Sequence, residues 1–168
     1  MAEDLKLLVL DVDGVMTDGS IYITDAGEEL KAFNSKDGHG IKLLMRAGLD
    51  VAIITGRVSM ALEHRVRDLG IKYVVQNCKD KRAALLDLAE ELGIPTAQMA
   101  FMGDDVVDLP AMRLCGLSFA PADALPMVKA EAGIVTERCG GRGCVREAIE
   151  EILRRVGKFD EVMARYVE

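Results

Sequence analysis

The sequence contains few aromatic residues and few histidines, and these shortages narrow its chemistry. It has no tryptophan, and aromatic residues make up only 4% of its 168 residues. Because half of the residues are hydrophobic and nine are methionine, the core is expected to be aliphatic and filled with methionine. Two histidines and four cysteines without a repeated metal-type spacing do not predict a zinc site. The cysteines are expected to be reduced thiols of a cytosolic protein: Cys78, Cys115, Cys139 and Cys144.

Long apolar runs are also missing from the sequence. The first apolar run extends only from Leu5 to Leu10 and contains Lys6. It is too short for the core of a signal peptide or for a membrane span, so we expect a cytoplasmic protein without membrane contact. The net charge of −7 argues against a general nucleic-acid binder, which needs a basic surface. A local cation can still make a single pocket attractive to an anionic substrate.

Short apolar runs alternate with longer amphipathic stretches along the chain. The length suggests one domain over residues 1–168, which is large enough to bury about 70% of the surface of the unfolded chain. The alternation predicts an α/β protein whose central parallel sheet is covered by helices on both faces. Strands are predicted at Leu5–Leu10, Val51–Ile54, Tyr73–Val75, Met99–Met102, Leu117–Phe119 and Gly133–Val135. Helices are predicted at about Gly40–Ala47, Ser59–Leu69, Lys81–Leu92, Leu109–Cys115, Ala124–Ala130, Cys144–Val156 and Phe159–Tyr166. Four of these helices are expected to end at a glycine, namely Gly48, Gly70, Gly93 and Gly116.

One segment interrupts this alternation. Residues 20–33 place β-type side chains on both sides of a turn at 25–27, which predicts a hairpin directly after the first strand. Because of this position we interpret the hairpin as a flap over a site; a surface hairpin without such a role is the alternative. The tail after Gly157 is the segment expected to move independently.

The first predicted strand ends at two carboxylates, Asp11 and Asp13, which are followed at once by Gly14. A strand end is a place where a loop can aim both groups at one point. Two neighbouring acids repel each other and are costly to bury, so the pair points to a bound cation or to catalysis. The alternative is a polar turn that caps a buried strand.

Three more predicted strands end in residues that suit the same chemistry. These residues are Thr55-Gly56-Arg57, then Lys79-Asp80-Lys81, and then Gly103-Asp104-Asp105 with Asp108. Each group alone is equally explained by a helix cap, a solvated face or a helix dipole. In an open α/β sheet, however, ligands bind at the carboxyl ends of the strands, where these residues meet.

Together these residues indicate phosphoryl transfer through an aspartyl-phosphate. A carboxylate can attack phosphorus and divide a difficult hydrolysis into two easier displacements. Asp11 and Asp104 supply the oxygen ligands that suit Mg²⁺, which reduces the repulsion between nucleophile and phosphate. Thr55 and Lys81 can hold the phosphoryl oxygens. Asp13 can protonate the leaving alkoxide and later deprotonate the attacking water.

These ordered motifs resemble the haloacid dehalogenase-like phosphatase superfamily along almost the whole chain. The matching motifs are Asp11–Gly14, Thr55, Lys81 and Gly103–Asp108. The resemblance implies a Rossmann-like three-layer fold, with a small hairpin flap after the first strand and no cap domain.

The same resemblance implies a role for each matching residue. Asp11 would be the nucleophile and Asp13 the general acid and base. Lys81 would be the lysine of the family motif, and Lys79 would take its place if the motif were aligned two residues earlier. The carboxylates of Asp11 and Asp104 and the backbone carbonyl of Asp13 would hold Mg²⁺. Asp105 and Asp108 would lie behind these ligands, with Asp108 supporting the waters of the metal or Lys81.

More narrowly, the chain is similar to the 3-deoxy-D-manno-octulosonate 8-phosphate phosphatase family. The similar segments are Asp11–Gly19, Phe33–Gly38, Thr55–Ser59 and Gly140–Gly143. The similarity implies a capless enzyme of lipopolysaccharide precursor synthesis, assembled as a homotetramer with sites near subunit interfaces. We also hypothesise that the Gly140–Gly143 loop and the tail after Gly157 complete the site of a neighbouring subunit.

The resemblance also implies a substrate-binding set. Its members are Asn34, Ser35, Lys36, Asp37, Gly38, Lys42, Thr55, Gly56, Arg57, Arg65 and Lys81. Arg57 and Arg65 are expected two turns apart on one helix. Ser35 and His39 depart from the familiar pattern, where a branched and an aromatic residue are more usual. Either departure can alter the sugar pocket, although His39 is better explained as a helix-terminal histidine.

Three alternatives to this function remain. A phosphatase for a nine-carbon keto-sugar-acid phosphate is related, but a glutamate after Thr55-Gly56 would be typical there, whereas this chain has Arg57. A signalling receiver domain also uses clustered aspartates, a threonine and a lysine around Mg²⁺, but lacks an acid two residues after the phosphoacceptor. A sugar-phosphate binder without activity is disfavoured by the intact set of motifs.

Overall fold

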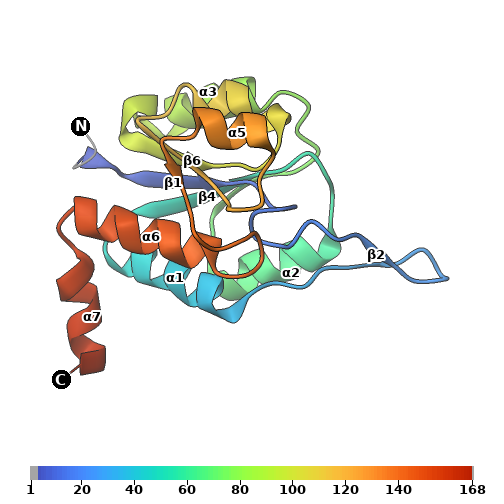
Figure 1. Ribbon diagram of the computed structural model, residues 1–168, viewed down its shortest axis with the longest axis horizontal. Helices are drawn as coiled ribbons and strands as arrows, with labels where there is room; N and C mark the ends of the chain where they lie inside the picture. The colour runs from blue at the N-terminus through green and yellow to red at the C-terminus, as the bar shows by residue number, and fades with distance from the viewer. Residues whose placement is uncertain (1–3, 168) are drawn as a thin grey trace.

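The computed structural model describes residues 4–167, and a six-stranded parallel sheet lies at its centre (Figure 1). The strand order is β5-β4-β1-β6-β7-β8. The bounds are Leu7–Leu10 for β1, Asp50–Ile54 for β4, Tyr73–Val75 for β5, Met99–Met102 for β6, Leu117–Ala120 for β7 and Ile134–Val135 for β8. The order of apolar runs thus correctly predicted all six strands of this sheet.

Strand β1 lies in the middle of the sheet, and its register aligns the ends of its neighbours. Leu10 pairs with Ile53 of β4 and with Met102 of β6. Because the three strands are parallel and end nearly level, the residues that follow them share one edge of the sheet. This alignment brings the loops after β1, β4 and β6 together.

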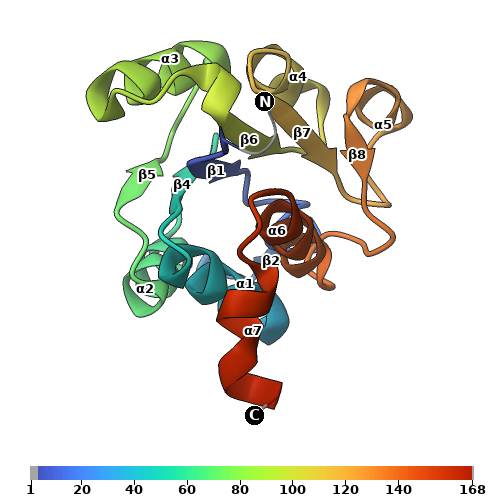
Figure 2. The same ribbon diagram turned by 90° about the vertical axis from the view of Figure 1, so that its left-hand side faces the viewer.

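Helices cover both faces of the sheet, so the three-layer prediction is confirmed (Figure 2). The helices are α1 (Ser35–Arg46), α2 (Met60–Leu69), α3 (Lys81–Leu92), α4 (Leu109–Met112), α5 (Pro126–Glu131), α6 (Cys144–Arg155) and α7 (Phe159–Val167), with short 3₁₀ turns at Thr96–Gln98 and Val106–Asp108. Helices α3, α4 and α5 lie on one face, and α1, α2 and α6 on the other (Figure 2). None of the helices within residues 4–167 has the length and apolar character that crossing a membrane requires.

The alternation of side chains along β1 builds a core on each face of the sheet. Leu8 and Leu10 pack on the side of α1, α2 and α6, whereas Leu7 and Val9 pack on the side of α3, α4 and α5. All four side chains are at most 1% exposed. The core is largely aliphatic with several methionines, as predicted, although Phe101 is among its largest fully buried side chains.

The predicted hairpin is present as β2 (Tyr22–Ile23) and β3 (Glu29–Leu30), which pair antiparallel outside the main sheet. It projects from the body at the end opposite to α7 (Figure 1). Among residues 4–167 no insertion forms a cap domain over the sheet edge, and the role of the hairpin as a flap stays a prediction.

Two helix predictions need correction. Helix α1 begins at Ser35, five residues before the predicted Gly40, because the Asn34 side chain accepts hydrogen bonds from the backbone N–H groups of Lys36 and Asp37.

The helix predicted to reach Cys115 ends at Met112, so Gly116 does not cap it. A Cβ at Gly116 would instead overlap the backbone of Ala97, which explains the glycine by a close approach of two segments. Gly70 and Gly93 do end α2 and α3 in the left-handed conformation.

The tail after Gly157 forms α7, which packs against the body. Val162 is buried in the core on the side of α1 and α6. The Tyr166 hydroxyl accepts a hydrogen bond from Arg46 at 2.9 Å and lies 3.1 Å from Nε2 of His39. His39 is therefore a surface residue of α1 that contacts the C-terminal helix, and the independent mobility of this tail stays a prediction.

The buried Asp37 caps helix α6 from a different helix, because the cap residue of α6, Gly143, offers no side chain. The Asp37 carboxylate accepts a hydrogen bond from the backbone N–H of Arg146 at 2.9 Å. Burial raises the pKa of the Asp37 carboxyl above its usual value, against the lowering effect of the hydrogen bonds from the start of α6. The interaction therefore depends on an acceptor at this position more than on its negative charge.

We predict that Asp37→Ala lowers the free energy of unfolding by about 1–3 kcal/mol, since it leaves buried N–H groups of α6 unpaired. Asp37→Asn should lose less, because its amide oxygen still accepts a hydrogen bond. Thermal and urea unfolding would measure both, with the exposed Asp87→Ala on α3 as the matched control. Equal stability of Asp37→Ala and Asp87→Ala would contradict the capping role.

Candidate active site

A buried ammonium joins two carboxylates at the carboxyl edge of the sheet. Lys81 Nζ lies 2.8 Å from Asp11 Oδ1 and 2.6 Å from Asp108 Oδ1. The three side chains are 6%, 9% and 0% exposed, respectively. Burial alone would lower the pKa of the Lys81 ammonium, but the charges and hydrogen bonds of Asp11 and Asp108 outweigh burial and raise it. Lys81 is therefore held as a cation beside the residue predicted to be the nucleophile.

The start of α3 positions Lys81. The Asp80 side chain accepts a hydrogen bond from the backbone N–H of Ala83 at 3.0 Å, so it caps the helix and makes Lys81 its first residue. Lys79 lines the same pocket from the preceding loop, although it forms no ion pair among residues 4–167. The structure thus favours the predicted Lys81 over its replacement Lys79 as the cation next to Asp11.

Asp108 organises the loop after β6. One of its oxygens binds Lys81, and the other accepts hydrogen bonds from the backbone N–H groups of Asp104 (3.0 Å) and Asp105 (3.2 Å). Asp105 is exposed, and its own side chain caps the short helix Val106–Asp108. Because both oxygens of Asp108 already accept hydrogen bonds, this residue fixes the position of Asp104 and of Lys81.

Three acids in this site lie close together. Asp11, Asp104 and Asp108 each offer a carboxylate oxygen within 4.8 Å of the others. Burial, with the charges of Asp11 and Asp108, raises the pKa of Asp104 to about 8. Burial and the Asp108 charge, opposed by Lys81, raise the pKa of Asp11 to about 6. Oδ1 of Asp104 is buried and has no hydrogen-bond partner among the described residues. A divalent cation with a preference for oxygen fits this donor set, because it would neutralise the repulsion and supply the missing partner.

Gly14 allows the two acidic loops to approach each other. Its φ is 87°, and a Cβ on it would overlap the Asp104 carboxylate. The turn around it is supported by the Gly140–Gly143 loop of the same chain, since the Gly141 N–H donates to the Val15 carbonyl at 3.0 Å. This loop therefore supports the turn that follows Asp11 and Asp13 in its own chain.

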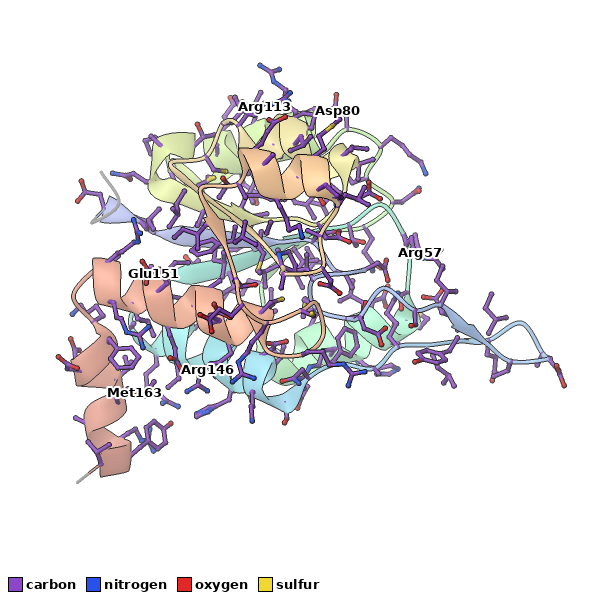
Figure 3. All side chains as sticks on the ribbon, viewed as in Figure 1. Arg57, Asp80, Arg113, Arg146, Glu151 and Met163 are labelled. Atoms are coloured by element: carbon purple, nitrogen blue, oxygen red, sulfur yellow. The ribbon has the colours of Figure 1, made fainter. Side chains whose placement is uncertain are left out.

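Asp13 belongs to a ring of four charges that we call the flap clamp: Asp13, Glu29, Lys31 and Arg57. Lys31 Nζ lies 2.6 Å from Asp13 Oδ1 and 2.8 Å from Glu29 Oε1. Arg57 Nη2 lies 2.6 Å from Glu29 Oε2, and Arg57 Nε lies 3.8 Å from Asp13 Oδ2. The clamp joins the hairpin to the loops after β1 and β4, and Arg57 lies where the hairpin leaves the body (Figure 3).

Sequence reasoning missed two members of the flap clamp, Glu29 and Lys31. Burial acts to lower the pKa of Lys31, but its hydrogen bonds to Asp13 and Glu29 outweigh burial and raise it. The sequence offers only a weak indication of these two residues. They are opposite charges two positions apart, near the second strand of a hairpin that was interpreted as a flap.

A pocket of about 380 Å³ opens onto these groups. Its lining includes all four residues predicted to be catalytic, namely Asp11, Asp13, Thr55 and Lys81, together with Gly56, Asp104 and Asp105. Cys78 and Val107 also line it and were not predicted. The convergence predicted from four strand ends is therefore present in the structure.

The predicted substrate residues fall into two groups. Thr55, Gly56 and Lys81 line the pocket, and Arg57 reaches its rim through Asp13. The remaining members lie on α1, its cap and α2: Asn34, Ser35, Lys36, Asp37, Gly38, Lys42 and Arg65. None of this second group lines the pocket of the same chain as described over residues 4–167.

Contacts within the second group show how its members are held. Arg65 Nη2 donates to the Asn34 carbonyl at 3.4 Å. Lys36 lines a separate cavity of about 360 Å³ with Arg138 and Arg146, at the start of α6. Figure 3 shows Arg146 at this end of α6, next to α1.

The expectation that Arg57 and Arg65 share a helix is wrong. Helix α2 begins at Met60, because the Ser59 side chain caps it by accepting a hydrogen bond from the Leu62 N–H at 3.2 Å. Arg57 therefore lies in the loop before the helix, where it can reach Glu29 of the hairpin.

The chain matches a known hydrolase family over part of its length and curated relatives over most of it. Residues 38–116 match the family model described as "Hydrolase: haloacid dehalogenase-like hydrolase". The chain is 46% identical over 166 residues to the 3-deoxy-D-manno-octulosonate 8-phosphate phosphatase of Escherichia coli strain K12, covering 99% of this chain and 88% of that protein.

Solved structures of similar proteins have the same fold. The phosphatase of that name from Yersinia pestis superposes with a TM-score of 0.93 at 47% identity, covering 95% of this chain and 86% of that one. The one from Moraxella catarrhalis was solved with magnesium, phosphate and 3-deoxy-D-manno-octulosonate (KDO). It gives a TM-score of 0.96 at 38% identity, covering 98% of this chain and 95% of that one. Since the identity extends over nearly the whole chain, the protein belongs to the 3-deoxy-D-manno-octulosonate 8-phosphate phosphatase family of haloacid dehalogenase-like hydrolases.

Proposed function

We propose that this protein is a Mg²⁺-dependent phosphomonoesterase that converts 3-deoxy-D-manno-octulosonate 8-phosphate into the free sugar acid and phosphate. The observation that carries the proposal is the pocket in which Asp11, paired with Lys81, lies two residues from Asp13. The relative solved with magnesium, phosphate and KDO supports the same chemistry. We place the reaction in lipopolysaccharide precursor synthesis, as the family resemblance implies, and in the cytoplasm, as the short first apolar run predicts.

Mg²⁺ would be held by the carboxylates of Asp11 and Asp104 and by the backbone carbonyl of Asp13. The unpaired, buried Oδ1 of Asp104 and the raised pKa values of Asp11 and Asp104 support these ligands. When bound, Mg²⁺ would offset the negative charge that phosphate and carboxylates bring together. Asp108 and Asp105 would hold the ligand loop from behind, which agrees with the hydrogen bonds of Asp108 to that loop.

The residues of the chain divide the reaction into two displacements. In the first, Asp11 attacks phosphorus while Asp13 protonates the leaving alkoxide, and an aspartyl-phosphate forms. In the second, Asp13 removes a proton from water, which attacks the same phosphorus and releases Asp11. Thr55 and Lys81 hold the phosphoryl oxygens during both steps. This use of Asp13 separates the proposal from a receiver domain, which stores the phosphoryl group.

Arg57 favours the eight-carbon substrate over its nine-carbon relative, because the family resemblance implies a glutamate after Thr55-Gly56 in the nine-carbon type. It is a cation at the rim of the pocket, where the carboxylate of a sugar acid needs a partner. Its side chain is 43% exposed and paired with Glu29, so it can turn toward a substrate without opening the core.

We further propose that the protein forms a homotetramer in which the second group of substrate residues serves a neighbouring pocket. That group does not line the pocket of its own chain over residues 4–167, and a neighbouring subunit would bring the two together. The hairpin and the start of α2 expose apolar side chains that suit such an assembly: Ile21, Tyr22, Ile23, Leu30, Val58 and Met60. Participation of the Gly140–Gly143 loop and of the tail after Gly157 in a neighbouring site stays a hypothesis.

The first test of the proposed function is phosphate release from a panel of sugar phosphates, with Mg²⁺ and with a chelator. We expect the eight-carbon sugar-acid phosphate to be the best substrate and the chelator to abolish its hydrolysis. Asp11→Asn should reduce kcat by at least about a thousandfold, because an amide is a poor nucleophile. Asp87→Asn on the surface of α3 is the control. Inactivity on the whole panel, or full activity of Asp11→Asn, would contradict the proposal.

The second test uses the raised pKa of Asp104. In the metal-free protein Asp104 is protonated below about pH 8, so Mg²⁺ must displace that proton. We therefore expect Mg²⁺ affinity to rise as the pH increases from 6 to 8, by up to about tenfold per pH unit. Calorimetry in two buffers of different ionisation enthalpy should show proton release near pH 7. The release should disappear in Asp104→Asn, whereas equal affinity at pH 6 and pH 8 would count against the assigned ligand.

A further inference from the structure

Building on the proposed function, we propose that Lys31 is a positioning residue for the general acid and base, Asp13. Its ammonium holds the Asp13 carboxylate in the orientation needed for proton transfer. The hairpin therefore helps to set the geometry of catalysis.

The burial of Lys31 is the first observation in support. Its side chain is only 3% exposed, although β3, the strand before it, lies in a hairpin whose side chains are mostly exposed. A buried ammonium is costly unless carboxylates pair with it, and Lys31 lies within 2.8 Å of both Asp13 and Glu29. A lysine that served only solubility would keep its ammonium in water.

Only one of the two carboxylate oxygens of Asp13 accepts a hydrogen bond within the flap clamp. Oδ1 accepts a short hydrogen bond from Lys31 at 2.6 Å. Oδ2 lies 3.8 Å from Arg57 Nε, which is too far for a hydrogen bond. Because the carboxylate torsion of an aspartate is broad, a fixed bond to one oxygen selects the direction of the other. Oδ2 is thus left to exchange a proton with the substrate.

Glu29 anchors this arrangement. It binds Lys31 through Oε1 and Arg57 through Oε2, so the hairpin is tied to the loop after β4 as well as to Asp13. The flap clamp contains two cations and two anions, so Lys31 is balanced by Glu29 and adds no net charge around Asp13.

The proposed role affects only steps that use Asp13. In the first displacement the proton of Asp13 moves to the bridging oxygen as the phosphorus–oxygen bond breaks and the Asp11–phosphorus bond forms. In the second, Asp13 takes a proton from the attacking water as the Asp11–phosphorus bond breaks. Lys31 neither gives nor takes a proton. An alkyl leaving group needs the first proton, whereas p-nitrophenolate is a stable anion and leaves without it.

The experiment compares Lys31→Met with wild type on the eight-carbon sugar-acid phosphate and on p-nitrophenyl phosphate at saturating Mg²⁺. The readout is kcat/KM, which includes departure of the leaving group but not hydrolysis of the aspartyl-phosphate. We expect kcat/KM to fall by at least about tenfold for the sugar phosphate and by less than about threefold for p-nitrophenyl phosphate. The ratio of the two values is independent of the folded fraction, so partial misfolding cannot produce the result.

Three further variants sharpen the comparison. Asp13→Asn should change the ratio in the same direction and further, and adding Lys31→Met to it should produce no additional change. Glu29→Gln, which keeps Lys31 but weakens its anchor, should produce a smaller change. Lys72→Met, at an exposed lysine just before β5, is the matched control and should leave the ratio unchanged.

Equal losses on both substrates, or no loss, would overturn the positioning role while leaving the proposed function intact. A wild-type protein that hydrolyses neither substrate would contradict the proposed function itself. The two failures are therefore distinguishable.

Discussion

The placement of the Lys81 ammonium between Asp11 and Asp108 is the interaction on which the site depends. These two carboxylates and Asp104 approach one another in a largely buried space, where their mutual repulsion is strong. Lys81 offsets part of that repulsion, and through Asp108 it is linked to the backbone of the loop that carries Asp104. The remaining excess of negative charge is what makes the pocket suited to a divalent cation and, with it, to a phosphate.

This interaction is possible because of the parallel sheet. Strands β1, β4 and β6 are adjacent and in register, so their carboxyl ends present Asp11, Thr55 and the Asp104 loop at one edge. The chain order of these motifs follows from the strand–helix alternation. The sequence was therefore sufficient to predict the parallel sheet, the hairpin, and the convergence of Asp11, Asp13, Thr55 and Lys81 on one pocket.

The features that could not be predicted depend on contacts between distant segments. Lys31 and Asp13 are eighteen positions apart, and nothing in the local pattern shows that the hairpin folds back onto the turn after β1. Asp37 caps α6, which begins more than a hundred positions later in the chain, and no periodicity of the sequence reveals this contact. The early start of α1 follows from the Asn34 cap, which outweighs the low helix propensity of two glycines.

The central claim is that Asp11 carries the phosphoryl group during turnover. The most direct measurement is acid quench of a reaction with Mg²⁺ and the sugar phosphate, followed by borohydride reduction and mass spectrometry of the peptide that contains residue 11. The account predicts an acyl-phosphate at Asp11, which borohydride reduces to homoserine. The labelled fraction should be larger for Asp13→Asn with p-nitrophenyl phosphate as the substrate, because this variant hydrolyses the intermediate slowly. Labelling of a different residue, or an unmodified Asp11 in an Asp13→Asn protein that has released p-nitrophenolate in amounts equal to the enzyme, would contradict the account.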